Sequence, residues 1–237
     1  MELALPCGAA YVLRALRAAG HEAYVVGGCV RDSLLGRVPV DWDVTTSALP
    51  EETKAVFSGA PVIETGIRHG TVTVLVDGEP VEITTYRVDG PYSDGRRPDS
   101  VAFTRSLRED LARRDFTVNA MAWSPETGLA DPFGGADDLR GGVIRSVGDP
   151  ARRFQEDALR ILRALRFSAA LGFSVEVKTA GALRAGRALL GKVSAERITA
   201  ELVKLVCGEN APAVLRTFPE VIAQVLPAWD CDPGALG

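Results

Sequence analysis

A glycine pair and two aspartates stand close together near the start of the chain, in the stretch GGCVRDSLLGRVPVDWD over residues 27–43. The apolar residues before the glycines predict a buried strand, and the residues after them predict a short helix. The pattern predicts, in order, a strand over Ala23–Val26, a turn at Gly27 and Gly28, a helix over Val30–Leu35 and a strand around Val40–Thr45. A strand that turns directly into a helix favours a fold in which helices cover a sheet.

Strand patterns dominate the rest of the first half of the chain, and helical patterns fill the second half. Asp77 and Gly78 lie between two β-rich runs, which is a hairpin signal. From Pro150 onward the apolar periodicity is helical throughout and begins with one long helix over residues 150–171. We therefore expect an α+β fold in two domains. A head domain with a mixed sheet and helices would span residues 1–148, and an all-helical domain would span residues 149–237.

Composition narrows the kinds of site that the chain can carry. The 237 residues are 46% apolar and 24% charged, as in ordinary globular proteins, and contain no long uninterrupted apolar run, so no membrane span is expected. The four cysteines are scattered and there are two histidines, which argues against a zinc site or disulfide framework and favours a reducing cytoplasm. Residues 1–150 hold fifteen Lys or Arg against twenty-two Asp or Glu, whereas residues 151–206 hold eleven against five. This asymmetry suits a metal-dependent enzyme with a polyanionic substrate.

The aspartates are candidate metal ligands. On a strand, Asp41 and Asp43 would face the same side, about 6.6 Å apart, with Trp42 on the opposite face. Carboxylate oxygens suit Mg²⁺, with phosphate oxygens completing its shell. Such a pair alone is more often a surface or capping feature. A further carboxylate, Glu82, lies mid-strand among apolar neighbours, and a third site carboxylate and an ordinary edge-strand glutamate are equally good interpretations of it.

The glycine pair is a candidate phosphate site. Backbone N–H groups of Gly27 and Gly28 at the start of a helix would face an anion, and Arg31 in the first helical turn would reach the same anion. The alternative is a plain strand–turn–helix in which the glycines serve packing only.

Five segments, in order and at matching spacing, resemble the class II tRNA nucleotidyltransferase and poly(A) polymerase family of the DNA polymerase β-like superfamily. They are GGCVRDSLLGRVPVDWDVTT, RRDFTVNAMAW, DPFGG with a following DL, RFQEDALRILRALRF and VSAERI. The resemblance covers the chain from residue 21 to about 206. It implies a polymerase β-like nucleotidyltransferase head followed by a helical neck and part of a body domain. Members of this family are usually longer, with further helical domains that hold the tRNA.

The family resemblance also implies a role for each matching residue. Asp41 and Asp43 would hold two catalytic Mg²⁺ ions, with Glu82 as a third carboxylate. Gly27, Gly28 and Arg31 would bind the triphosphate. The remaining roles would be ribose recognition by Arg114 and Asp115, base recognition by Asp157 and Arg160, and RNA binding or structural support by Arg163, Arg166 and Arg197.

The base-recognition pair has a physical rationale. If residues 150–171 form one helix, Asp157 and Arg160 share a face of it. The carboxylate only accepts hydrogen bonds and the guanidinium only donates them, so the pair would match the amino donor and ring acceptor of cytosine or adenine. The alternative is a surface ion pair at helical spacing.

The resemblance implies an enzyme that adds CCA to the 3′ end of tRNA from CTP and ATP without a template and releases pyrophosphate. Bacterial poly(A) polymerase and enzymes that add only CC or only A are the nearest alternatives, and a non-catalytic RNA-binding module is an alternative from another class. The expected partners are the tRNA acceptor stem and nucleoside triphosphates, with no membrane and no protein partner. The segment Val88–Val101 corresponds to the family's flexible loop, which is associated with the change from CTP to ATP, and its complete length favours CCA addition.

Overall fold

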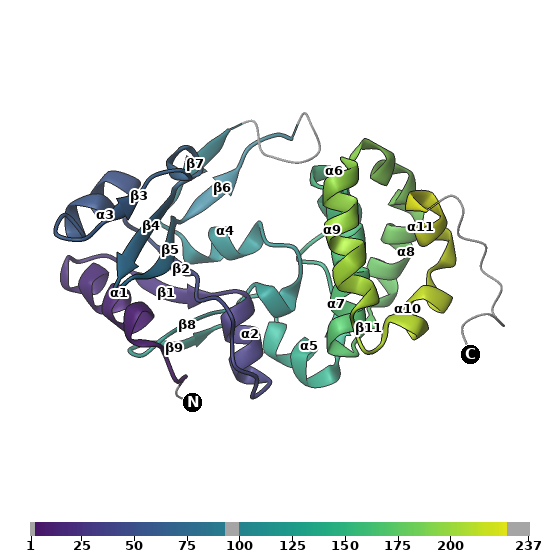
Figure 1. Cartoon of the computed structure of the whole chain (residues 1–237), viewed down its shortest axis with the longest axis horizontal. Helices are drawn as coiled ribbons and strands as arrows, with labels where there is room; N and C mark the ends of the chain where they lie inside the picture. Colours follow the sequence, from purple (N-terminus) through teal and green to yellow (C-terminus); the bar gives the residue numbers. More distant parts are fainter. Residues whose placement is uncertain (1–2, 93–99, 227–237) are drawn as a thin grey trace. The chain divides into compact units, whose positions relative to one another are not determined.

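The computed structural model describes residues 3–92 and 100–226, and the chain divides into two compact units (Figure 1). The first unit comprises Met1–Gly90, Ser100–Arg114 and Val118–Ala136. The second unit comprises Pro91–Asp99, Asp115–Thr117 and Asp137–Gly237. The chain therefore enters the second unit briefly at residues 115–117 before it leaves the first unit after Ala136.

The first unit is built on a seven-stranded sheet with the strand order β3-β4-β5-β2-β1-β8-β9. Strands β2 and β5 run parallel, and the neighbouring pairs on either side of them are antiparallel. The strands are β1 Ala23–Val26, β2 Val44–Thr46, β3 Val62–Ile63, β4 Thr71–Val76, β5 Glu79–Thr85, β8 Ala122–Ser124 and β9 Gly128–Ala130. The predicted α+β fold with a mixed sheet is confirmed.

The hairpin between β4 and β5 forms where the sequence predicts it. Asp77 and Gly78 both have positive φ, at 52° and 87°. Two consecutive positive φ values belong to a type I′ turn, whose twist matches that of the strands on either side. The turn sets the register, so that Val74 lies opposite Val81 and Val72 opposite Ile83.

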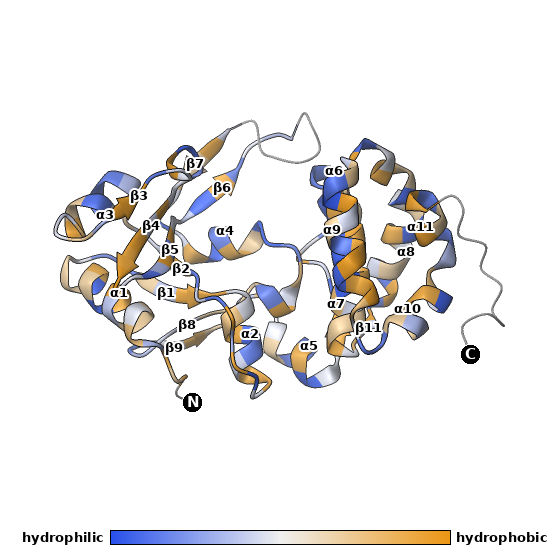
Figure 2. Cartoon of the chain, in the orientation of Figure 1, coloured by the Kyte–Doolittle hydropathy of each residue, from blue (hydrophilic) through white to orange (hydrophobic). Residues whose placement is uncertain are grey.

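The helices of the first unit cover the sheet. They are α1 Cys7–Ala18, α2 Gly28–Leu34, α3 Pro50–Val56 and α4 Leu107–Ala112, with a 3₁₀ helix, η1, at Ile67–His69. Helix α1 packs on β1, β2 and β5 through Val12, Leu13 and Leu16, which are buried at helical spacing. Figure 2 shows β1 and β4 largely in orange, as expected for strands that supply the core.

A two-stranded antiparallel ribbon projects from the first unit. It pairs β6 Arg87–Asp89 with β7 Val101–Phe103. The ribbon forms the two ends of the predicted loop Val88–Val101, and residues 93–99 of that loop lie outside the described residues.

The second unit is mainly helical. Its helices are α6 Pro150–Glu156, α7 Leu159–Leu171, α8 Val177–Gly186, the 3₁₀ helix η3 Arg187–Lys192, α9 Ala195–Val206, α10 Ala211–Thr217 and α11 Pro219–Val225. Two elements, η2 Thr117–Asn119 and α5 Gly135–Gly141, contain residues of both units. A short parallel pair joins β10 Val143–Ile144 to β11 Ser174–Val175, so the prediction that the chain is helical throughout after Pro150 was wrong at β11.

The predicted single helix over residues 150–171 was also wrong, because the chain breaks at Asp157. This residue ends α6 in an extended conformation, with φ −143° and ψ 105°. Its side-chain Oδ1 accepts a hydrogen bond from the backbone N–H of Leu159, the first residue of α7, at 3.1 Å. An aspartate side chain that accepts a hydrogen bond from the backbone N–H two residues later offers that N–H an alternative to a helical hydrogen bond. The spacing of apolar residues does not reveal this alternative.

Helices α7 and α9 pack together and form the core of the second unit. Ile161, Leu162 and Leu165 of α7 are fully buried. Helix α9 shows orange and blue stripes along its length in Figure 2, which is the pattern of an amphipathic helix. Within residues 3–92 and 100–226, no helix has the length and apolar character needed to cross a membrane.

Candidate functional site

Asp43 and Glu82 lie side by side where strand β2 begins next to strand β5. In the parallel pair β2–β5, Val44 lies opposite Ile83, which places the preceding residues, Asp43 and Glu82, next to each other. The carbonyl oxygen of Asp43 also accepts a hydrogen bond from the N–H of Val26 in β1 at 3.0 Å. Glu82 therefore belongs to a strand between β4 and β2 and is not an edge-strand residue.

The aspartates precede the strand on which the sequence predicts them. Strand β2 begins at Val44, so the prediction of a strand around Val40–Thr45 was wrong at its start. Val38 and Val40 are 91% and 92% exposed and flank Pro39, which cannot donate a ladder hydrogen bond. A solvated segment therefore leads into the strand, and Asp41 and Asp43 lie at its end.

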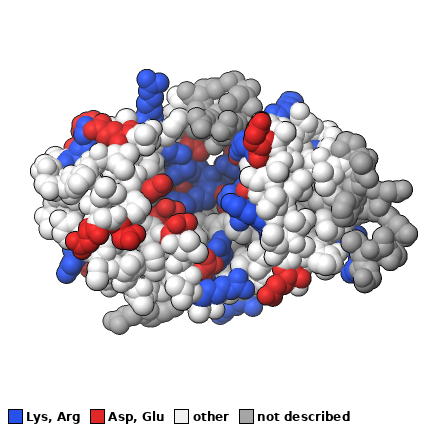
Figure 3. Space-filling view, in the orientation of Figure 1, with Lys and Arg blue, Asp and Glu red and all other residues white. Residues whose placement is uncertain are grey.

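The carboxylates influence each other. Loss of water around Asp43 raises the pKa of this carboxyl group, the negative charges of Glu82 and Asp41 raise it further, and Arg114 opposes them. Burial and the charge of Asp43 raise the pKa of the nearby Cys29 thiol to about 11. Figure 3 shows several acidic side chains exposed together on the first unit.

A divalent cation fits this donor set. Mg²⁺ prefers oxygen ligands and usually binds through one or two carboxylates while retaining waters or phosphate oxygens. Its charge would favour the ionised form of Asp43, whose pKa is raised by burial and by the neighbouring negative charges. Among the described residues, no three His, Cys, Asp or Glu side chains converge closely enough to form a complete metal site by themselves.

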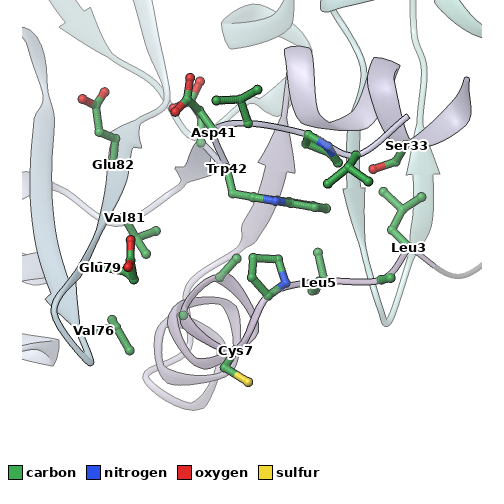
Figure 4. A pocket seen from close by; sticks show the side chains of 18 of the residues that line it. Leu3, Leu5, Cys7, Ser33, Asp41, Trp42, Val76, Glu79, Val81 and Glu82 are labelled. Carbon is green, nitrogen blue, oxygen red and sulfur yellow. The ribbon is translucent and has the colours of Figure 1, made fainter. Parts of the chain in front are cut away.

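A cavity of about 1240 Å³ lies beside these carboxylates in the first unit. Figure 4 shows the carboxylates of Asp41 and Glu82 at one edge of the cavity, and the Trp42 ring pointing away from them toward Leu5. The Trp42 side chain therefore points away from the carboxylate edge, although residues 41–43 precede β2 and do not lie on a strand as the sequence predicts.

The glycine pair forms the start of helix α2. Gly27 precedes the helix with φ 83° and ψ −126°, a backbone conformation that L side chains rarely adopt. Arg31, one turn into the helix, donates from Nη1 to the Asn119 Oδ1 at 2.6 Å and pairs with the neighbouring Asp32. The structure brings the side chain of Arg31 into a fixed arrangement beside the glycine pair.

Arg114 also lies beside the glycines. A Cβ atom built on Gly27 would lie 3.1 Å from the Nη1 atom of Arg114, so the guanidinium of Arg114 packs directly against Gly27. Arg114 pairs with Asp110 at 3.5 Å. The structure therefore places Gly27, Gly28, Arg31 and Arg114 in one neighbourhood, although the sequence assigned Arg114 to another part of the nucleotide.

Asp110 is a buried residue beside the candidate site, and it was not predicted from the sequence. Its side chain is 0% exposed and accepts hydrogen bonds from Thr45 Oγ1 at 3.2 Å, Arg113 Nε at 3.0 Å and the N–H of Arg87 at 3.3 Å. Although burial alone would raise its pKa, the guanidiniums of Arg113 and Arg114 and these hydrogen bonds hold the pKa of Asp110 below its usual range. The spacing of an aspartate three and four residues before two arginines on a helix was the available signal.

Asp115 begins a separate cluster in the second unit. It is 9% exposed, and its Oδ2 accepts hydrogen bonds from Arg163 Nε at 2.8 Å and Nη2 at 2.6 Å. Its Oδ1 accepts from the N–H of Phe116 at 2.8 Å. Arg163 also lies 3.8 Å from Glu201 of α9, which pairs with Arg166 as well. The structure gives Arg163 and Arg166 protein partners.

Asp157 and Arg160 do not share the face of one helix, and that prediction was wrong. Asp157 lies between α6 and α7 and accepts from Arg197 Nη2 at 3.0 and 3.2 Å. Arg160 lies in the first turn of α7 and pairs with Glu156 at 3.0 Å. Each member of the predicted pair therefore has its own oppositely charged partner, and Arg197 holds Asp157.

Two protein families match this chain. The family described as "Poly A polymerase head domain" matches residues 23–145. The family described as "Probable RNA and SrmB- binding site of polymerase A" matches residues 172–224. The first match contains the carboxylates, the glycine pair and Arg114.

Proteins named CCA-adding enzyme are similar to most of the chain. That of Lactobacillus helveticus (strain DPC 4571) is 52% identical over 207 residues, which are 87% of this chain and 51% of the relative. That of Geobacillus thermodenitrificans (strain NG80-2) is 49% identical over 209 residues, or 88% of this chain and 51% of the relative. The chain thus spans about half the length of these relatives.

Solved structures of CCA-adding enzymes are also similar to this chain. The Bacillus stearothermophilus CCA-adding enzyme in complex with CTP superposes with a TM-score of 0.81 at 44% identity, over 92% of this chain and 52% of that one. The Thermotoga maritima CCA-adding enzyme complexed with tRNA_CCA gives 0.78 at 28% identity, over 95% of this chain and 53% of that one. The chain belongs to the class II CCA-adding enzyme and poly(A) polymerase family and carries its polymerase head domain.

Proposed function

We propose that this chain carries the nucleotidyl-transfer site of a CCA-adding enzyme, which adds C and A to the 3′ end of tRNA from CTP and ATP and releases pyrophosphate. The observation that carries the proposal is the group of carboxylates formed by Asp41, Asp43 and Glu82 beside the glycine pair. Nucleotidyl transfer would belong to the head over residues 1–148, and base and RNA binding to residues 149–237.

Asp41 and Asp43 are the residues that would hold two Mg²⁺ ions, with Glu82 as the third carboxylate. When bound, such ions stabilise the attacking and leaving oxygens of an in-line phosphoryl displacement. The protein's own part is to position the reactants, and positioning contributes much of the rate when a bimolecular step becomes effectively unimolecular. No histidine or nucleophilic serine is required by this scheme.

The triphosphate would lie over Gly27 and Gly28, whose backbone allows close approach, with the guanidinium of Arg31 balancing its charge. Arg114, fixed by Asp110, would contact the same nucleotide. Asp115 would accept a hydrogen bond from the ribose 2′-hydroxyl.

Asp157 and Arg160 would recognise the base edge, although they lie on neighbouring elements and have partners of their own. Asp157 now pairs with Arg197, and Arg160 pairs with Glu156. A bound base would take over part of the hydrogen bonding in these two pairs. In this proposal the protein itself supplies the hydrogen-bond pattern that a template strand supplies in other polymerases. Arg163, Arg166 and Arg197 would act through support of these groups.

The proposed partners are the tRNA acceptor stem and nucleoside triphosphates, and the proposed location is the cytoplasm, where tRNA is processed. The relatives named CCA-adding enzyme favour this function over poly(A) polymerase and over enzymes that add only CC or only A. The intact carboxylates favour an enzyme over a non-catalytic RNA-binding module.

Incubation with single nucleotides tests the proposal. With a tRNA that lacks CCA, Mg²⁺ and one labelled nucleoside triphosphate at a time, we expect incorporation of CMP from CTP and none from GTP or UTP. A tRNA that already ends in CC should accept AMP. Long tails of A alone would identify a poly(A) polymerase, and incorporation of neither CMP nor AMP would contradict an enzymatic role.

Replacing Gly27 by alanine should weaken nucleotide binding by about tenfold, because the new Cβ would meet Arg114 Nη1 at 3.1 Å and displace this guanidinium from the proposed triphosphate site. Isothermal titration with CTP measures the effect. Gly20→Ala is the matched control, since Gly20 has a φ of 88° and nothing within 4 Å of the added Cβ. Equal CTP affinity in the two variants would show that the space over Gly27 is not used by the nucleotide.

Replacing Asp157 by alanine should reduce the discrimination of CTP and ATP from UTP and GTP and leave metal binding unchanged. The reason is that the variant loses the only hydrogen-bond acceptor of the proposed base-recognition pair. Incorporation rates with each nucleotide measure the discrimination, with exposed Glu209→Ala as the control. Unchanged rejection of UTP and GTP would remove Asp157 from base recognition.

A further inference from the structure

Helix α9 carries a buried glutamate between two arginines of α7. Glu201 is 6% exposed, and its Oε1 lies 3.8 Å from Arg163 Nη1. Its Oε2 lies 2.6 Å from Arg166 Nε, an ion pair whose angle is not that of a directed hydrogen bond. A buried carboxylate is strongly disfavoured unless cations accompany it, so the three side chains form one set.

The first connection from Glu201 to the proposed ribose site runs through Arg163. Two guanidinium nitrogens of Arg163 donate to the same oxygen of Asp115 at 2.8 and 2.6 Å. The charge of Asp115, followed by a smaller contribution from Glu201, raises the pKa of Arg163. Arg163 is therefore held from both sides, by Asp115 and by Glu201.

A second connection reaches Asp115 through aromatic rings. The guanidinium of Arg166 lies 4.0 Å from the centre of the Phe167 ring, within the range of a cation–π contact. Phe167 packs edge-on against Phe116, with the ring centres 5.8 Å apart. Phe116 is fully buried, and its N–H donates to Asp115 at 2.8 Å. The contacts thus close a ring that begins and ends at Glu201.

The charges explain why Glu201 is needed in this ring. Burial lowers the pKa of Arg166, and so does the like charge of Arg163, whereas Glu201 opposes both. Without the carboxylate of Glu201, Arg166 would lose the anion that pairs with it, and Arg163 would keep its hydrogen bonds to Asp115 but lose its contact with α9. The side chain of Arg163, and with it the Asp115 carboxylate that it binds, would then be held less firmly.

We propose that Glu201 is a positioning residue for ribose recognition, which fixes Arg163 and Phe116 so that the Asp115 carboxylate meets the 2′-hydroxyl of a ribonucleoside triphosphate. The inference rests on the proposed function of Asp115 in nucleotide binding. It predicts that a residue of α9 controls the preference for ribose over deoxyribose.

Titration of the chain with CTP and dCTP in the presence of Mg²⁺ tests this inference without a transfer reaction. We expect the unsubstituted chain to bind CTP more tightly than dCTP. In Glu201→Gln the ratio of the two affinities should fall by about tenfold, the effect of weakening one hydrogen bond to a charged group, and dCTP affinity should stay within about twofold. Glu196→Gln is the matched control, because Glu196 is an exposed glutamate on the same helix.

A second variant keeps the test independent of the buried glutamate. Arg163→Gln breaks the connection to Asp115 but leaves the Glu201–Arg166 pair, so it should also lower the CTP preference. A folded Glu201→Gln or Arg163→Gln chain that keeps the original ratio of affinities overturns the positioning role, while the proposed function stands. An unsubstituted chain that binds CTP and dCTP equally would instead refute the ribose role of Asp115, and one that binds neither would refute the proposed nucleotide site.

Discussion

Nucleotide transfer in Asp43→Asn should be about a thousandfold slower than in the unsubstituted chain. Asparagine keeps the size of the side chain but removes the charge that we propose binds a metal ion, and metal stabilisation of a phosphoryl transition state is worth several kcal/mol. The measurement is the single-turnover rate of CMP incorporation into a tRNA that lacks CCA. An activity within about tenfold of the original would contradict the role of Asp43 in catalysis.

The stability of the same variant distinguishes lost chemistry from lost structure. The folded state raises the pKa of Asp43, so its ionised form costs stability at every pH above the ordinary value of 3.8. Asp43→Asn should therefore unfold at the same or a higher temperature than the unsubstituted chain. Asp77→Asn is the control: Asp77 is exposed on the β4–β5 turn, lines the same cavity and has a φ of 52° that asparagine tolerates. It should retain full activity.

Asp110→Asn should lower the free energy of unfolding by about 3–5 kcal/mol, because it removes one charge from a buried group and leaves Arg113 and Arg114 without their common anion. Chemical denaturation measures the difference. Asp137→Asn is the matched control, since Asp137 and Arg140 have the same three-residue spacing as Asp110 and Arg113 but are highly exposed. Its effect should stay within about 0.5 kcal/mol.

The effect of Asp110 should also depend on pH. The folded state lowers the pKa of Asp110, so its stabilising contribution is fully present above 3.8, the ordinary value. As the pH falls below this value and through the lower pKa of the folded state, the contribution is lost. The stability difference between the unsubstituted chain and Asp110→Asn should therefore shrink in acid. A difference that stays constant down to pH 2 would contradict the ionised state of Asp110.

Local patterns predicted the parts of the fold that depend on neighbouring residues. The bounds of β1 and the hairpin turn at Asp77 and Gly78 follow from apolar runs and turn chemistry within a few residues. The glycine pair and the two aspartates likewise lie on one short stretch, so their proximity was predictable. The strand start at Val44 was not, because it depends on where β5 offers a partner.

Contacts between distant residues were beyond the reach of these patterns. Asp157 and Arg160 have favourable spacing for one helix, but Asp157 pairs with Arg197, forty residues away, and caps α7. Asp115 and Arg163 are forty-eight residues apart. A charged residue in a helical pattern appears exposed until the partner that buries it is known, which is why Glu201 escaped the sequence reasoning.

The most direct test of the account is the sequence of the product formed by this chain from a tRNA without CCA, with Mg²⁺, CTP and ATP present together. We predict that the tRNA gains C, C and A in that order and is then no longer extended, and that Asp43→Asn gives no product on the same time scale. Products that carry tails of A alone, or a tRNA that remains unextended under these conditions, would contradict the proposal that this chain contains a CCA-adding site.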